Sequence, residues 1–109
     1  MTVSELQAAL SLTPVSLPEG DREVEGVYIG DLLSWVMGRA QSDNAWLTIM
    51  SNLNIVAVAT LSDVACIILC EGVTLEESVR STAEAKGVNI LTTEAPAYET
   101  AKLLSELGL

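Results

Sequence analysis

The sequence of 109 residues contains no histidine, and its five basic side chains are outnumbered by fifteen acidic ones. The absence of histidine excludes His-based catalytic triads, His-ligated metal sites and the usual general base. The net charge of −10 argues against direct binding to nucleic acid or to an anionic membrane, because phosphate groups repel an acidic surface.

The sequence also lacks targeting and membrane signals. No basic segment precedes an apolar run at the N-terminus, so we expect no secretory signal. The most apolar run, residues 55–70, is interrupted by Thr60, Ser62 and Asp63 and falls short of the roughly 20 apolar residues of a membrane span. We therefore expect a cytoplasmic protein without membrane contact.

Cysteine is scarce, with only Cys66 and Cys70. In a strand these two residues would lie about 13 Å apart, because each residue rises about 3.3 Å, and a disulfide needs Cα atoms within about 7 Å. Two thiols alone also make a poor zinc site. The sequence predicts two buried small hydrophobic residues, and we expect no metal and no cofactor.

What is present is a hydrophobic fraction of 50% in a chain long enough for one domain, residues 1–109, with its own core. Hydrophobic periodicity and turn residues divide this domain into alternating elements. Helices are predicted near residues 3–10, 32–39, 53–61, 75–86 and 96–107, and extended segments near 15–17, 24–29, 45–50, 64–70 and 88–92.

The segment from Ile55 to Leu61 decides the fold. Its β-branched residues are compatible with a strand. We predict a helix, because an apolar strand follows at residues 64–70 and two parallel strands need a crossover of about a dozen residues. The resulting alternation predicts an α/β fold with three α/β/α layers around a mainly parallel sheet.

Four positions have the residue types that begin helices. Thr2 with Glu5, and Thr74 with Glu77, have the spacing of a capping box. Asp31 and Asn52 are predicted to cap the helices that follow them. Each prediction places a side-chain oxygen against the free amides of a helix N-terminus.

Polar, small or acidic residues follow each predicted parallel strand, and ligands of open parallel sheets bind beyond these carboxyl ends. Helix N-termini that meet at such an edge favour anions. Caps and turns need the same residue types, so capping alone and a ligand or partner site both remain open. The candidate ligand-binding residues are Gly30, Asp31, Asn52, Asn54 and Thr93.

The sequence offers little for catalysis. The Gly26 to Gly30 segment lacks the Gly-Lys-Ser/Thr ending of a phosphate-binding loop, and no nucleophile has a histidine to activate it. We therefore predict that the protein is not an enzyme. Asp31, Glu71 and Glu94 could share one sheet edge and bind a divalent cation, and the alternative is three separate surface acids.

Two predicted helices, residues 32–40 and 53–61, are apolar on nearly every face, whereas a surface helix of a small monomer has an apolar stripe. Either both helices are internal, or part of their surface is an interface. The second alternative predicts a homodimer that buries Trp35 or Met37.

Several segments together resemble the small bacterial proteins of the DRTGG-domain family. They are Val24-x-Gly26-x-Tyr28-x-Gly30-Asp31-Leu32-Leu33-Ser34-x-Val36-Met37, Trp46-x-Thr48, Asn54-x-x-Ala57-Val58-Ala59, Ile67-Ile68 and Gly87-x-x-Ile90-Leu91-x-Thr93. The resemblance covers essentially the whole chain. The chain departs from the family's namesake motif, because Asp21-Arg22 is followed by Glu23-Val24-Glu25-Gly26 and not by Thr-Gly-Gly.

The resemblance implies an α/β/α domain similar to the N-terminal domain of HPr kinase. Related domains are regulatory parts of larger enzymes, such as pyrophosphatases with CBS domains, where the domain lies at a dimer interface near an adenine-nucleotide site. It carries over no catalytic residue. The expected function is a non-catalytic, homodimeric regulatory or interaction module that acts on a partner enzyme or regulator. The alternative is a sensor of an anionic adenine nucleotide, bound at the strand ends.

Overall fold

A five-stranded sheet with the order β1-β5-β4-β3-β2 runs through the middle of the computed structural model, which describes residues 1–109. Strands and helices alternate along the chain as predicted. Their bounds are α1 Val3–Leu10, β1 Thr13–Ser16, β2 Val27–Ile29, α2 Leu33–Arg39, β3 Ala45–Thr48, α3 Asn54–Ser62, β4 Cys66–Leu69, α4 Glu77–Lys86, β5 Ile90–Thr92 and α5 Ala97–Glu106. No helix is long and apolar enough to cross a bilayer.

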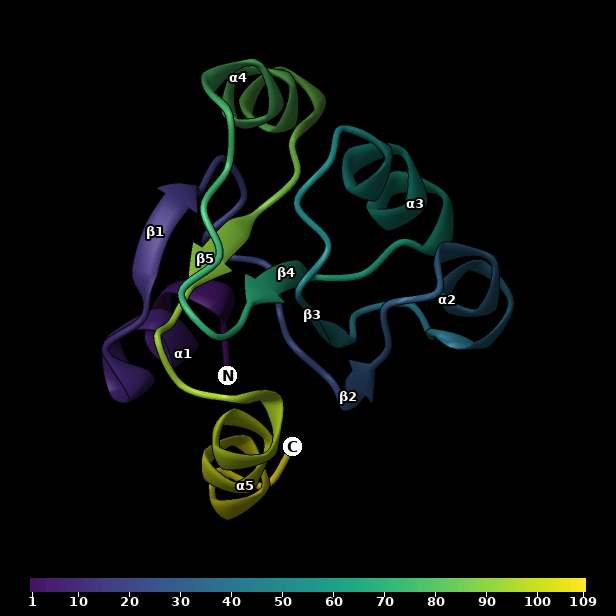
Figure 1. The fold of residues 1–109 in the computed structure, drawn as a ribbon. Coiled ribbons are helices and arrows are strands. Elements are labelled where there is room, and N and C mark those ends of the chain that lie inside the picture. The colour runs from purple at the N-terminus through teal and green to yellow at the C-terminus, as the bar shows by residue number, and fades with distance from the viewer.

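The sheet is mainly parallel, which confirms the predicted fold class. Strands β2, β3, β4 and β5 pair in parallel. Strand β1, expected only as a short extended piece, is an antiparallel edge strand on β5. Helices α2, α3 and α4 lie on one side of the sheet and α1 and α5 on the other (Figure 1), so the chain forms three α/β/α layers.

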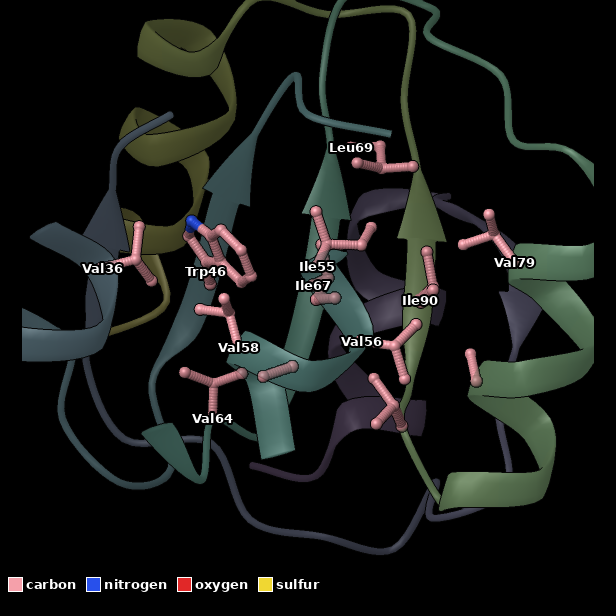
Figure 2. Packing of buried hydrophobic residues seen from close by; sticks show 13 residues of the cluster. Val36, Trp46, Ile55, Val56, Val58, Val64, Ile67, Leu69, Val79 and Ile90 are labelled. Atoms are coloured by element: carbon pink, nitrogen blue, oxygen red, sulfur yellow. The ribbon is translucent and has the colours of Figure 1, made fainter. Parts of the chain in front are cut away.

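One face of the sheet packs against α2, α3 and α4. Figure 2 shows this cluster, in which Trp46, Ile67 and Ile90 of the three central strands meet side chains of the three helices. The Trp46 side chain is fully buried, and its Nε1 donates a hydrogen bond to the carbonyl oxygen of Gly30 at 2.9 Å. This bond ties the end of β2 to β3.

The opposite face packs against α1 and α5 through Leu47, Ile68 and Leu91. Cys66 and Cys70 belong to this cluster and are both buried and unpaired, as predicted. Burial raises the pKa of the Cys66 thiol to about 12, and it also raises the pKa of Cys70. Both thiols therefore stay protonated at neutral pH and act as packing groups.

The segment that decides the fold is helical, as predicted. Helix α3 spans Asn54–Ser62 and buries Ile55, Val56, Val58 and Ala59. It connects β3 to β4, which pair in parallel with Trp46 opposite Ile67. The crossover requirement therefore outweighs the strand preference of its β-branched residues.

The helix starts agree with the sequence at two of the four predicted positions. At α1 the Thr2 amide donates to Glu5 Oε1 at 2.8 Å and the Glu5 amide donates to Thr2 Oγ1 at 3.1 Å, so this capping box is confirmed. The second box is wrong, because α4 begins at Glu77 without a side-chain cap. Thr74 instead lies in the segment that precedes the helix.

Of the other two cap predictions, the one for Asp31 is wrong and the one for Asn52 is confirmed. Helix α2 has no side-chain hydrogen bond at its N-cap, Leu32, because the carboxylate of Asp31 is turned back toward β3. The Oδ1 atom of Asn52 accepts from the Asn54 amide at 2.9 Å. Leu53 between them already has helical angles, with φ −59° and ψ −27°, so Asn52 caps the first turn of α3.

At the amino ends of the strands, Arg22 joins three loops. Its Nη2 atom donates to Asp43 Oδ1 at 3.0 Å, to Asp63 Oδ1 at 2.8 Å and to the Asp63 carbonyl oxygen at 2.6 Å. Asp43 and Asp63 have positive φ angles of 69° and 58°, a conformation that Asp and Asn tolerate better than most residues. We call this arrangement the Arg22 clasp.

The clasp predicts a pH-dependent stability. Hydrogen bonds from the Ser42 hydroxyl and the Arg22 guanidinium hold the pKa of Asp63 below its usual value. The stabilisation is therefore present above the unfolded pKa of about 3.9 and is lost as the pH falls through the lower folded value. In urea unfolding, Asp63→Asn should lower the free energy of unfolding at pH 7, and its difference from the wild type should shrink near pH 3.

The matched control is Asp21→Asn, because Asp21 is exposed and forms no ion pair. This control should leave the free energy of unfolding within about 0.5 kcal/mol of the wild type. An Asp63→Asn difference that is equal at pH 7 and pH 3 would contradict the role of the clasp.

Candidate functional site

The carboxyl ends of β2 to β5 meet at one edge of the sheet, and two hollows lie there. The larger, which we call the strand-end hollow, has a volume of about 650 Å³ and lies at the N-terminal ends of α3 and α4. It is lined by Ser51, Asn52, Leu53, Thr74, Leu75, Glu76, Ser78 and Val79. The smaller, the β5 hollow, has a volume of about 140 Å³ and is lined by Thr13, Gly72, Val73, Thr74, Thr92, Thr93 and Glu94.

Two of the predicted site residues line these hollows. Asn52 lies in the strand-end hollow, where its Oδ1 is bound to the Asn54 amide and its amide nitrogen has no partner within the chain. Thr93 lies in the β5 hollow, and its Oγ1 accepts from the Ala95 amide at 3.2 Å. The two side chains face different hollows that share the wall residue Thr74.

Gly30 and Asp31 line neither hollow. The Gly30 amide donates to the Leu47 carbonyl at 3.2 Å. The Asp31 carboxylate accepts from Thr48 Oγ1 at 2.8 Å and from the Ile49 amide at 3.0 Å. These bonds join the ends of β2 and β3 and so hold the first part of the edge in shape.

Asn54 is separated from the other predicted residues as well. As the first residue of α3 it lines a groove between α3 and α4. The five candidate residues are thus spread over two hollows, one strand junction and one helix groove. The five residues, which follow predicted parallel strands in the sequence, therefore do not form one site.

The charge of the edge is mixed. The strand-end hollow offers hydroxyls from Ser51, Thr74 and Ser78 and the N-termini of two helices, which favour anions. Glu76 in the same lining repels them. The cation site considered for Asp31, Glu71 and Glu94 is not formed, because no three acidic or thiol side chains come together in a metal-binding group.

The outward surface of α2 exposes large apolar side chains, and we call this surface the α2 face. Trp35 and Met37 lie on its two flanks, either side of the buried Val36. Leu32, Trp35 and Met37 are 57%, 52% and 51% exposed. The Arg39 guanidinium carbon lies 3.7 Å from the centroid of the Trp35 ring, a cation–π contact. The alternative in which this helix is wholly internal is therefore wrong, since Val36 is its only buried residue.

The α2 face belongs to an almost uncharged part of the chain. Between Leu32 and Ser62 the only charged residues are Arg39 and Asp43, which cancel, so the net charge of −10 arises entirely outside this stretch. Composition taken over the whole chain hides this asymmetry. A count of charges segment by segment would have revealed it from the sequence.

Comparison with known proteins was made for family, sequence and structure. The family model described as "DRTGG domain" matches residues 16–107. No curated protein matches the sequence. Among solved structures, the chain is similar to the CBS and DRTGG domains of the regulatory region of Clostridium perfringens pyrophosphatase, complexed with its activator diadenosine tetraphosphate.

This structural match has a TM-score of 0.73 at 14% sequence identity. It covers 94% of this chain and 45% of the other chain. The chain therefore spans less than half of that regulatory region, and the match shows a shared fold.

The bonds of Asp31 predict a structural role that can be measured. Asp31→Ala removes the carboxylate that binds Thr48 Oγ1 and the Ile49 amide, and it should lower the free energy of unfolding by about 1–2 kcal/mol. Hydrogen exchange at the Ile49 amide should accelerate at the same time. The control is Glu94→Gln, because Glu94 is exposed at the same edge without an ion pair. Unchanged exchange at Ile49 would contradict this role.

Proposed function

Because this chain belongs to the DRTGG-domain family, we propose that it is a non-catalytic regulatory module, which acts by binding a partner enzyme or regulator. The similar pyrophosphatase carries its DRTGG domain in a regulatory region. The residues of this chain support the same role. It has no histidine, and its two thiols are buried with raised pKa values.

The single observation that carries the proposal is the α2 face. Soluble monomers seldom expose several large apolar side chains on one short helix, and such surfaces mark interaction sites. Two chains that each carry a charge of −10 repel one another. Contact through the uncharged stretch keeps the acidic surfaces apart and buries Trp35 and Met37. The proposed assembly is a homodimer formed through this face.

Light scattering tests the homodimer. The wild type should have the mass of two chains at micromolar concentration. Trp35→Glu should give the mass of one chain, because it introduces a charge into the α2 face and removes the ring that contacts Arg39.

The matched control is Tyr98→Glu on α5, since Tyr98 is an aromatic residue exposed by 76% on the opposite layer. This variant should remain dimeric. A wild type that is monomeric at micromolar concentration, or a Tyr98→Glu variant that dissociates as Trp35→Glu does, would contradict the assembly.

A second candidate function is a sensor of adenine nucleotides, and the strand-end hollow is the observation that favours it. The hollow lies where ligands of parallel sheets bind, and its 650 Å³ fall within the usual range of ligand sites. The similar structure was solved with diadenosine tetraphosphate. Because Glu76 lines the hollow, magnesium bound to the phosphates would reduce the repulsion.

Thermal unfolding with diadenosine tetraphosphate and with ATP, each with and without magnesium, tests this candidate. A nucleotide at 100 times its dissociation constant stabilises the folded state by about 2.7 kcal/mol and should raise the Tm by several degrees. Asn52→Asp should abolish the shift, because the new carboxylate repels phosphate. Gln41→Glu makes the same charge change at the opposite edge and should keep the shift. If no nucleotide shifted the Tm, the sensor would be ruled out and only the regulatory binding module would remain.

A further inference from the structure

Helices α3 and α4 are neighbours on the same side of the sheet (Figure 1). An open groove lies between them, which we call the α3–α4 groove. Its volume is about 510 Å³, and it is lined by Leu53, Asn54, Val56, Ala57, Thr60, Leu61, Thr82 and Lys86. Leu53 and Leu61 at its two ends are 52% and 71% exposed. The groove is separate from the α2 face and meets the strand-end hollow only at Leu53.

Besides Asn54, the polar residues of this groove are two threonines and one lysine. The Thr60 hydroxyl donates to the Val56 carbonyl at 3.0 Å, and the Thr82 hydroxyl donates to the Ser78 carbonyl at 2.8 Å. Both hydroxyl protons are therefore used inside their own helices. Lys86 is the only charged residue in the lining.

Two of the five cations of the chain, Lys86 and Lys102, have no partner, and only Lys86 lines the groove. Arg22 and Arg80 form ion pairs with carboxylates, and Arg39 lies over the Trp35 ring. Lys86 has no anionic partner within the chain, although acidic residues are three times as numerous as basic ones. An apolar groove with one unpaired ammonium group at its side is complementary to an apolar surface that carries one carboxylate.

We propose that the α3–α4 groove binds an amphipathic helix of a partner protein, whose apolar stripe contacts Leu53 and Leu61 and whose carboxylate pairs with Lys86. Leu53 and Leu61 are eight residues apart, which is about 12 Å along a helix axis. A partner helix with apolar residues at i, i+4 and i+7 spans about 10.5 Å. The length and the open shape of the groove therefore suit a helix.

This inference rests on the proposed regulatory function and specifies what kind of partner segment the module binds. It does not depend on the homodimer. The contact residues of the groove and of the α2 face are different. A variant of one surface therefore leaves the other intact, and the two proposals can fail separately.

The test uses two helical peptides in fluorescence anisotropy. Both have leucines at i, i+4 and i+7, and they differ only in one flanking residue placed to meet Lys86, which is Glu in the first and Lys in the second. The wild type should bind the Glu peptide about two to five times more tightly than the Lys peptide, because an exposed ion pair changes a dissociation constant by about this factor. Lys86→Gln should remove this preference, and Lys86→Glu should invert it.

Matched controls separate the groove from general charge effects. Lys102→Glu makes the same charge change on α5 and should keep the preference for the Glu peptide. Leu61→Ala should weaken both peptides by at least threefold, whereas Leu103→Ala, an exposed leucine on α5, should weaken neither. Circular dichroism must show that each variant is folded.

Three results would overturn the proposal. They are the absence of binding of both peptides to the folded wild type, equal preferences in the wild type and in Lys86→Glu, and a Leu61→Ala variant that scatters light as a monomer while the wild type is a dimer. The last result would assign the groove to a second copy of the chain. Loss of dimerisation in Trp35→Glu with unchanged peptide preference would instead concern the α2 face alone.

Discussion

The structure depends on covering a mainly parallel sheet on both faces with a chain of 109 residues. Strands β3 and β4 are buried along their whole length, and their side chains alternate between two separate clusters. Burial of this kind requires helices on both sides, which α2, α3 and α4 provide on one face and α1 and α5 on the other. Helix α3 contributes four buried residues, whereas α2 contributes only Val36. The apolar residues that α2 does not bury remain on the surface.

The surface of the protein has an apolar, uncharged part and an acidic part, and the apolar part includes the residues that α2 leaves exposed. The stretch from Leu32 to Ser62 carries no net charge, while the rest of the chain carries −10. Residues at the centre of a protein–protein interface lose their contact with water, which is costly for charged groups. Such interfaces are therefore apolar and carry few charges at their centre. The strand-end hollow is polar and includes Glu76, which suits a different kind of ligand. The proposed regulatory module would therefore have two surfaces of contrasting chemistry, one apolar and uncharged and one polar.

The fold could be predicted from the sequence because the pattern that determines it, an apolar strand preceded by a crossover segment, lies within one continuous stretch of the chain. The 64–70 strand is apolar without alternation, and the segment before it has the length of a crossover, so α3 followed from both. Two of the four caps could not be predicted in the same way. Asp31 has the residue type of a helix cap, but its carboxylate binds Thr48 and the Ile49 amide, partners that only the pairing of β2 with β3 brings within reach. The Arg22 clasp and the α3–α4 groove likewise combine residues from segments that the sequence does not connect.

We propose above all that the protein acts through the α2 face. Hydrogen–deuterium exchange over a range of protein concentrations that spans dimer formation tests it most directly, because the exchange of each segment is read in the unmodified chain. The account predicts that residues 32–39 become protected as concentration rises, while the loops at residues 70–76 and 93–96 do not change. Protection confined to those loops, or no concentration dependence anywhere, would contradict it.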